Sequence, residues 1–377
     1  MPHKTSDINL LWILPIVGSV KNLEKEGTLI RVIRELRFLK KKFKKIYFIS
    51  KDFETLDIGK GIEHHHIPIK VPAFLQNLLF LFNPLFIHKP YRVSGIYYVD
   101  HVSGCFPAVL AKLLYRKKII VRYDWSWSEF ARKDYSYPTY LAISFFEKIS
   151  LKSADVIIVT TPTLRNKVQE IIKINKKTIL IDNWTDTKIF SPSKKRTYKK
   201  YITIISVGRL WPQKNFQLIL KAINLLDNKI KSRIRLLIIG SGFEEENLKR
   251  SAAEYHINLT IKKGVPNRKV AKLLKDSDVF ISSSKYEGQP RVIIEAMSCG
   301  LPIIATNIPG NNELIKNNDT GLLIDIDEKN LAEKLEKLLS APKLRKKLGE
   351  NSRRYAAKRF SFQKVMSEIY GTIQKNI

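Results

Sequence analysis

The sequence has little cysteine and no long uninterrupted apolar run. Only Cys105 and Cys299 are present among 377 residues, which excludes a disulfide framework and a four-thiolate metal site. The apolar stretch at residues 8–20 resembles the core of a signal peptide, but Pro15 divides it, so we expect a first buried strand there. No other targeting or membrane-spanning segment is evident, and we therefore predict a cytoplasmic protein.

Acidic residues are scarce relative to basic ones. The chain carries 67 Lys and Arg against 35 Asp and Glu, a formal net charge of +32. The excess is +19 in residues 1–200 and +13 in residues 201–377, so it is not confined to a tail. Two interpretations stay open. One is a compositional bias toward lysine and isoleucine, and the other is a polyanionic partner such as an anionic membrane leaflet, phosphorylated glycolipids or nucleic acid.

Two segments of the N-terminal half favour the membrane interpretation. Arg31, Arg34, Arg37 and Lys41 recur at helical spacing, although cations near a helix C-terminus also favour the helix dipole. The segment 71–87 (VPAFLQNLLFLFNPLFI) is apolar and aromatic but too short to span a bilayer. A basic helix and an apolar segment in one domain are typical of a protein that lies on a membrane surface, so we predict peripheral association at the inner face. A position in the core is the alternative for residues 71–87.

Strand-like apolar runs alternate with helical patterns along the whole chain. This alternation predicts an α/β protein with two doubly wound Rossmann-like domains, each built on a parallel sheet. We predict an N-terminal domain over 1–190, a linker over 191–200, a C-terminal domain over 201–355 and a final helical segment over 356–377. The predicted strands are 10–14, 46–50, 95–99, 119–123, 156–160, 178–182, 202–207, 235–240, 258–262, 279–283, 302–306 and 321–324.

The most informative segment is 286–300 (YEGQPRVIIEAMSCG). Pro290 suits the start of a helix, and Gly300 suits its C′ position. Such a helix points its first N–H groups and its positive dipole end at the preceding loop, which makes an anion site. Glu287 would lie at the mouth of this site, and Glu295 about a turn and a half inside the helix. An anion site flanked by carboxylates predicts a ligand that carries both phosphates and hydroxyls, such as a nucleotide sugar.

Two basic residues follow the predicted strand 202–207. Arg209 and Lys214 lie five residues apart in the loop that opens a helix at Asn215. An arginine can bind two phosphate oxygens at once, while a lysine supplies a point charge. In a chain this basic, two such residues by themselves carry little weight, but their setting in VGRL and QKN favours a functional role.

The spacing of Glu287 and Glu295 closely resembles the Glu-x7-Glu motif of the family-four retaining glycosyltransferases (the group 1 type). The segments 205–226, 300–315 and 181–192 are similar to the segments that flank this motif in the family. The resemblance covers roughly the C-terminal half and is thin before residue 100. It implies the GT-B fold, in which two Rossmann-like domains face each other across a cleft and the last helix crosses back to the N-terminal domain.

The resemblance also implies roles for individual residues. Glu295 would bind the ribose hydroxyls of the donor, Glu287 would contact the transferred sugar, and Arg209 and Lys214 would neutralise the leaving phosphate without a metal or other cofactor. The diphosphate would be held by the backbone N–H groups around residues 289–292. The other predicted donor-binding residues are Gly208, Gly288, Gln289, Pro290, Arg291 and Val292.

The N-terminal domain offers fewer candidates. Asp124 follows the predicted strand 119–123 at its C-terminal end, where ligands bind in such sheets. Many relatives have a histidine near this position, so the catalytic role given to Asp124 departs from the family pattern. For the acceptor we nominate Gly27, His101 and Trp125, although Trp125 would equally suit packing. The tract 64–66 is all histidine, and we expect it to form a surface loop and not a metal site.

These features predict a metal-independent retaining glycosyltransferase. It would move a sugar from a nucleotide-diphosphate sugar to a lipid-linked or polysaccharide acceptor in cell-surface glycan synthesis, such as lipopolysaccharide. A basic nucleic-acid-binding protein is an alternative that would explain the charge, but the sequence has no zinc-finger spacing, RNA-binding aromatic signature or basic-zipper heptads, so we expect no nucleic-acid partner. A non-catalytic nucleotide-sugar binder is a further alternative. The sugar, the base, the acceptor and the oligomeric state stay open.

Overall fold

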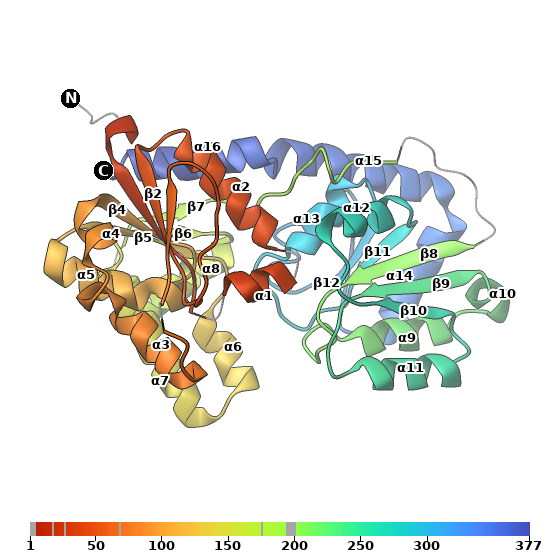
Figure 1. The fold of residues 1–377 in the computed structure, drawn as a ribbon. Helices are drawn as coiled ribbons and strands as arrows, with labels where there is room; N and C mark the ends of the chain where they lie inside the picture. Colours follow the sequence, from red (N-terminus) through yellow and green to blue (C-terminus); the bar gives the residue numbers. More distant parts are fainter. Residues whose placement is uncertain (1–4, 17–18, 26–27, 68, 175, 194–200) are drawn as a thin grey trace. The chain divides into compact units, whose positions relative to one another are not determined.

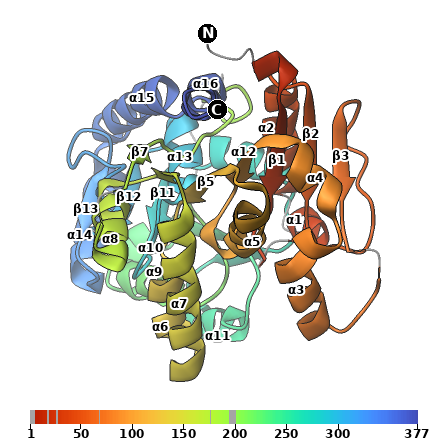
Figure 2. The ribbon, with the colours of Figure 1, turned by 90° about the vertical axis from the view of Figure 1, so that its left-hand side faces the viewer.

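A computed structural model describes residues 5–16, 19–25, 28–67, 69–174, 176–193 and 201–377. The chain divides into two compact units. Unit 1 comprises residues 1–181 and 366–377, and unit 2 comprises residues 182–365 (Figures 1 and 2). The acceptor candidate Gly27 and residues 194–200 of the predicted linker lie outside the described residues.

Each unit is built on one parallel sheet. The strand order is β3-β2-β1-β4-β5-β6-β7 in unit 1 and β10-β9-β8-β11-β12-β13 in unit 2. The α/β prediction is therefore confirmed, and each of the twelve predicted strands is found within two residues of its predicted bounds. The strands are β1 Asn9–Ile13, β2 Lys45–Ile49, β3 Ile62–His65, β4 Ser94–Val99, β5 Lys118–Tyr123, β6 Val156–Val159, β7 Thr178–Leu180, β8 Ile202–Val207, β9 Ile234–Ile239, β10 Leu259–Lys262, β11 Val279–Ser282, β12 Ile303–Thr306 and β13 Leu322–Ile324.

Helices connect most of the successive strands, with loops between β2 and β3 and between β12 and β13. The α-helices are α1 Val20–Lys25, α2 Leu29–Lys40, α3 Ala73–Phe82, α4 His88–Val93, α5 Cys105–Tyr115, α6 Trp127–Asp134, α7 Tyr137–Ser153, α8 Pro162–Ile172, α9 Phe216–Asn224, α10 Asn228–Lys231, α11 Glu245–Glu254, α12 Asn267–Lys275, α13 Arg291–Ser298, α14 Glu328–Ser340, α15 Pro342–Arg359 and α16 Phe362–Gln374. Three 3₁₀ turns accompany them, namely η1 Thr5–Asp7, η2 Asn83–Leu85 and η3 Val102–Gly104. Among the described residues, none of the helices is both long and apolar enough to cross a membrane.

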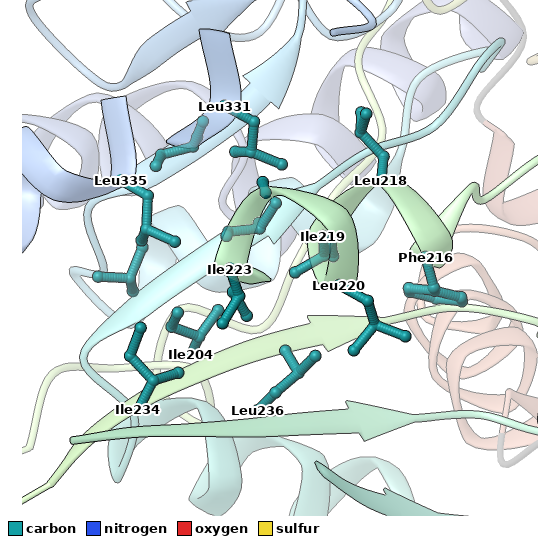
Figure 3. Close-up of a cluster of buried hydrophobic side chains, with 14 of the residues drawn as sticks. Ile204, Phe216, Leu218, Ile219, Leu220, Ile223, Ile234, Leu236, Leu331 and Leu335 are labelled. Carbon is teal, nitrogen blue, oxygen red and sulfur yellow. The ribbon is translucent and has the colours of Figure 1, made fainter. Parts of the chain in front are cut away.

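The sheet of unit 2 is covered by helices on both faces, which explains why its strands are apolar on both sides. On one face, Ile204 of β8 packs with Ile219 and Ile223 of α9 and with Leu331 and Leu335 of α14 (Figure 3). On the other face, Phe280 of β11 and Ile303 of β12 pack against the buried side of α13. This double cover fixes the strand ends from which the candidate site is built.

The two membrane-binding segments predicted in the N-terminal half lie on opposite faces of the unit 1 sheet. The step from β1 to β2 runs across the sheet in the opposite direction to the step from β4 to β5, and right-handed crossovers therefore place α2 and α5 on different faces. The core on the α5 face contains Phe80 of α3 and Leu151 of α7. The basic helix α2 and the apolar helix α3 therefore do not form one continuous surface.

The expectation of a surface loop at 64–66 is wrong. Residues 62–65 form the edge strand β3, in which His64 pairs in register with Phe48 of β2. The His64 side chain is buried, its Nε2 lies 2.9 Å from the Ser50 hydroxyl, and its Nδ1 accepts a hydrogen bond from the Leu56 N–H at 2.9 Å. Sheet pairing and these two hydrogen bonds outweigh the low strand propensity of a histidine tract.

Candidate functional site

The principal candidate site of unit 2 lies at the carboxyl ends of β8 and β11. These two strands are neighbours, and the chain leaves them toward opposite sides of the sheet, which makes their ends a topological switch point. Ligands of doubly wound sheets bind at such points. The loop 208–215 follows β8, and the loop 283–290 follows β11, so the two predicted segments meet here.

Two of the predicted catalytic residues form an ion pair across this point. Lys214 Nζ contacts Glu287 Oε1, with the two side chains 16% and 9% exposed. The Ser284 hydroxyl donates to the same carboxylate oxygen at 2.7 Å. The Ser283 hydroxyl donates to the Lys214 carbonyl at 2.8 Å. A lysine and a glutamate that are 73 residues apart in the chain are thus held together in a largely buried position.

Hydrogen bonds join the two loops on either side of this ion pair. The Gln213 amide donates to the Tyr286 carbonyl at 2.9 Å, and the Lys285 N–H donates to the Gln213 carbonyl at 2.8 Å. The loop 208–215 ends at Asn215, which has a φ of 49°. Asparagine tolerates this left-handed conformation better than most residues, and as the N-cap it allows α9 to begin at Phe216, two residues after Lys214.

Arg209 lies at the exposed start of the same loop. Its guanidinium lies 5.5 Å from the ring centroid of Trp211, and the Trp211 and Phe243 rings meet edge to face at 5.2 Å. Trp211 is 41% exposed and Phe243 is 65% exposed. The loop therefore presents a cation and the Trp211 ring, and Phe243 from the loop after β9 adds a second accessible ring.

Two predicted donor-site glycines are each backed by a second glycine. A Cβ at Gly240 would lie 1.8 Å from the Gly208 carbonyl oxygen, and a Cβ at Gly310 would lie 1.8 Å from the Gly288 carbonyl oxygen. Gly310 also has a φ of +87°, which side chains rarely adopt. The path of both loops thus depends on residues that are remote in the sequence.

Helix α13 starts directly after the second loop. Pro290, predicted as the first helical residue, is its N-cap, so the helix starts one residue later at Arg291. The first N–H groups of any helix have no partner within the helix itself. The helix ends at Gly300 (φ +71°), where the N–H groups of Gly300 and Leu301 bond to the carbonyls of Met297 and Ala296 in a Schellman motif. The predicted anion-binding helix is therefore present, with Arg291 and Val292 in its first turn.

Glu295 lies on the buried side of α13. It is 5% exposed, and its charge, together with burial, raises the pKa of the nearby Cys299 thiol to about 12. A carboxylate at this depth is costly unless polar partners compensate it. Its position within the second turn of α13 is the one expected for it from the sequence.

Gln289 connects the second loop to the first residues of unit 2. Its side-chain oxygen accepts from the Asn183 N–H at 2.5 Å, its amide donates to Asp182 at 2.7 Å, and the Asn183 amide donates to its carbonyl at 2.9 Å. Arg359 in turn binds both oxygens of Asp182 at 2.8 Å. The side chain of Gln289 is thus used within the protein, where it holds this loop to the start of unit 2.

The candidate residues of unit 1 also gather at one place. His101 follows β4, Asp124 and Trp125 follow β5, and the His101 ring stacks on the Trp125 ring at 4.4 Å. His101 Nε2 lies 3.9 Å from Asp124 Oδ1. Burial lowers the pKa of His101, and the ring accepts from the Ser103 N–H at Nδ1, so it is a neutral group with its proton on Nε2.

Sequence reasoning did not identify Ser284, Asn183 or the pair Trp211 and Phe243. Ser284 and Asn183 fix Glu287 and the Gln289 backbone respectively. A signal for Ser284 was available, because polar residues directly after a buried strand commonly line a switch-point site. No local signal identifies Asn183, since its partner lies 106 residues away.

Comparison with known proteins shows that the chain is similar to glycosyltransferases. Residues 187–355 match the family model described as "Glycosyl transferases group 1". The chain is 26% identical to the capsular polysaccharide biosynthesis glycosyltransferase CapM of Staphylococcus aureus, over 90% of this chain and 93% of that protein. It is 33% identical to the UDP-Gal:alpha-D-GlcNAc-diphosphoundecaprenol alpha-1,3-galactosyltransferase of Escherichia coli, over 43% of this chain and 44% of that protein. Alignments with three further curated relatives cover 69%, 63% and 62% of their own lengths.

The solved structures support the fold over the whole chain. The sucrose-phosphate synthase of Thermosynechococcus elongatus superposes with a TM-score of 0.81 at 17% sequence identity, covering 98% of both chains. At this level of identity the likeness shows the fold alone. It confirms the predicted GT-B fold.

Proposed function

Residues 187–355 form a domain of the glycosyltransferase group 1 family within a chain of the GT-B fold, and from this premise we propose that the protein is a metal-independent, retaining glycosyltransferase. The donor is a nucleotide-diphosphate sugar. The acceptor is a lipid-linked or polysaccharide glycan of the cell surface. The enzyme works at the cytoplasmic face of the membrane as a peripheral protein.

The observation that carries this proposal is the pairing of Lys214 with Glu287 in front of the N-terminus of α13. Cleavage of a nucleotide sugar leaves negative charge on the diphosphate and positive character on the sugar. Preorganised cations and N–H groups stabilise the negative charge on the diphosphate, and a carboxylate stabilises the positive character of the sugar. The cations and N–H groups come from Lys214, Arg209 and the first turn of α13, and the carboxylate is that of Glu287.

In the proposed reaction the bond between the anomeric carbon and the leaving phosphate oxygen breaks, and the acceptor hydroxyl attacks from the same face. The leaving phosphate oxygen takes the acceptor proton, so no separate general base is needed. Glu295 binds the ribose hydroxyls. In unit 1, Asp124 is the candidate contact to the transferred sugar, and His101 and Trp125 are the candidate contacts to the acceptor.

The proposed acceptor class rests on the relatives. The Staphylococcus aureus protein is named for capsular polysaccharide biosynthesis, and the Escherichia coli protein for transfer of galactose to a diphosphoundecaprenol-linked sugar. The latter name also carries UDP, which makes UDP the first nucleotide to test.

The test is calorimetry of the purified protein with UDP, GDP and ADP and their sugar conjugates, with and without EDTA. We expect one nucleoside diphosphate to bind, equally well in EDTA, and Lys214→Ala to lose that binding. Binding that disappears in EDTA would contradict metal independence. If no nucleotide bound while duplex DNA or RNA bound with a steep salt dependence, the charge of +32 would indicate a nucleic-acid-binding protein instead.

A nucleotide sugar that binds without turnover on any glycan acceptor would indicate a non-catalytic binder. Retention is tested separately, by the NMR coupling constant of the anomeric proton in the product. An inverted anomeric centre would contradict the same-face mechanism.

A further inference from the structure

Unit 1 exposes an apolar surface formed by α3, η2 and α7. Phe74 is 71% exposed, Leu75 45%, Phe82 42% and Phe145 60%. Leu78, Leu85, Phe86, Tyr137 and Leu141 are also exposed on these elements. Within α3 only Phe80 is buried, so most of this helix's apolar side chains are left in solvent. Contiguous exposed apolar surface of this kind marks an interaction site.

A row of phenylalanine rings makes this surface continuous across three helices. Phe82 of α3 meets Phe106 of α5 edge to face at 5.8 Å, and Phe106 meets Phe146 of α7 at 5.6 Å. Phe146 in turn meets Phe145 at 5.9 Å. In Figure 2, α5 lies between α3 and α7, as these contacts require.

The same helices present no carboxylate to solvent. Residues 69–93, 102–118 and 135–153 contain nine Lys or Arg and a single acidic residue, Glu147. Glu147 is fully buried and caps α6, where it accepts from the Trp127 N–H at 2.7 Å. The basic residues are Lys70, Lys89, Arg92, Lys112, Arg116, Lys117, Lys118, Lys148 and Lys152.

We propose that the surface of α3, η2, α5 and α7 docks onto an anionic lipid bilayer, with Phe74, Leu78, Phe82 and Phe145 inserted at the level of the headgroups. Exposed apolar and aromatic side chains, on segments that carry nine cations and no exposed carboxylate of their own, match the chemistry of that boundary. A second copy of the same surface is disfavoured, because two basic patches would repel each other. The basic helix α2 is not part of the docking surface, since it lies on the other face of the sheet.

The docking surface lies near the acceptor candidates of unit 1, and the role that we give to docking rests on the proposed function. Phe106 of α5 lies five residues after His101, and Phe130 of α6, a helix that packs against α7, contacts Trp125 at 5.0 Å. The docking surface therefore adjoins the carboxyl ends of β4 and β5, where the acceptor candidates gather. A bilayer bound here delivers a lipid-linked acceptor directly to that end of the sheet.

The experiment is co-sedimentation of the full chain with vesicles of phosphatidylcholine containing 30% phosphatidylglycerol, and with pure phosphatidylcholine vesicles. We expect the double variant Phe74→Ser, Phe145→Ser to lower the vesicle partition coefficient about a hundredfold, because each phenylalanine ring removed from the bilayer should weaken binding about tenfold. The matched control is Leu225→Ser with Ile326→Ser, two exposed apolar residues of unit 2 (53% and 47%), which should change binding less than about twofold. Circular dichroism establishes that all variants are folded.

A second pair of variants tests the charges. Lys89→Gln with Arg92→Gln should weaken binding to the anionic vesicles about tenfold or more and leave binding to pure phosphatidylcholine unchanged. Lys41→Gln with Lys44→Gln removes the same charge near α2 and should have a much smaller effect, because it lies on the other face of the sheet. Equal losses from the two charge pairs, or wild-type binding by the Phe74 and Phe145 variant, would overturn the proposal.

Two further outcomes are informative. Failure of the wild type to bind vesicles, together with a dimer in analytical ultracentrifugation that the phenylalanine variants dissolve, would overturn the proposal in favour of an interface between copies. Nucleotide binding measured without vesicles reports on unit 2 alone. Failure of membrane docking is therefore distinguishable from failure of the proposed function.

Discussion

Gly310 contacts no predicted ligand group, yet its replacement by alanine should inactivate the enzyme. The added Cβ would lie 1.8 Å from the Gly288 carbonyl oxygen and 3.2 Å from the Glu287 carbonyl oxygen. Contacts of real Cβ atoms essentially never fall below 3.0 Å, so the loop that carries Glu287 must move by about 1.2 Å. A displacement of about 1 Å at reacting groups lowers turnover about a hundredfold.

The matched control is Gly264→Ala. Gly264 also has a positive φ (+56°), but a Cβ there would meet nothing within 4 Å. Both substitutions therefore cost about 1–2 kcal/mol of left-handed backbone strain, and only Gly310→Ala adds a displacement of the candidate site. The comparison separates a general loss of stability from a specific loss of geometry.

The assay is the release of nucleoside diphosphate from the donor identified by calorimetry, at saturating donor and at a temperature where both variants are fully folded. Gly310→Ala should be about a hundredfold slower than Gly264→Ala. Turnover by the two variants within about twofold of each other would refute the reasoning. It would mean that the loop 283–290 either absorbs the shift or does not hold reacting groups.

Three other predictions follow from the described contacts. Lys214→Ala should lower turnover at least about tenfold, because it removes the cation that faces the leaving group and the partner of Glu287. Glu295→Ala should weaken nucleotide binding. Wild-type turnover and wild-type nucleotide affinity in these two variants would remove both residues from the site. Burial lowers the pKa of His64 from 6.5 to about 4, so below pH 6.5 the unfolded chain takes up a proton that the folded chain does not. Stability should therefore fall by up to about 3 kcal/mol between pH 6.5 and 4, and His64→Gln should flatten this decline in urea midpoints measured at pH 7 and 4.5. Arg359→Ala should lower the free energy of unfolding by about 2 kcal/mol in urea titrations. Arg359→Lys should lose less of this free energy than Arg359→Ala but still fall below the wild type, since a lysine cannot bind both Asp182 oxygens.

The sequence alone predicted the elements that repeat a simple pattern. The runs 202–207 and 279–283 are largely apolar because their sheet is covered on both faces, and Gly300 indicates the end of α13 by its chemistry. The strand β3 was not predicted, because its residues (IEHH) have low strand propensity and become a strand only through pairing with β2.

The remaining features depend on contacts between distant residues. The approach of Gly310 to Gly288 and the bonds of Gln289 to Asn183 follow from the way the loops pack, which no local pattern encodes. The sequence favoured a membrane-binding surface for the apolar segment 71–87 but left a position in the core as the alternative. Its composition is the same in either case, and only the packing of α3 on a single buried ring, Phe80, decides the question.

The hydrogen bonds of Gln289 connect the loop 283–290 to the covalent joint between the units. The chain passes from unit 1 to unit 2 between Ile181 and Asp182, and it returns between Val365 and Met366. Gln289 holds Asp182 and Asn183 directly, and Arg359 clamps Asp182 from the helix that precedes the return. Under the proposed function, a donor that ordered the loop 283–290 would also stiffen the peptide on which any hinge between the units must turn. By reciprocity, a substitution at that hinge would then alter donor affinity without touching the donor.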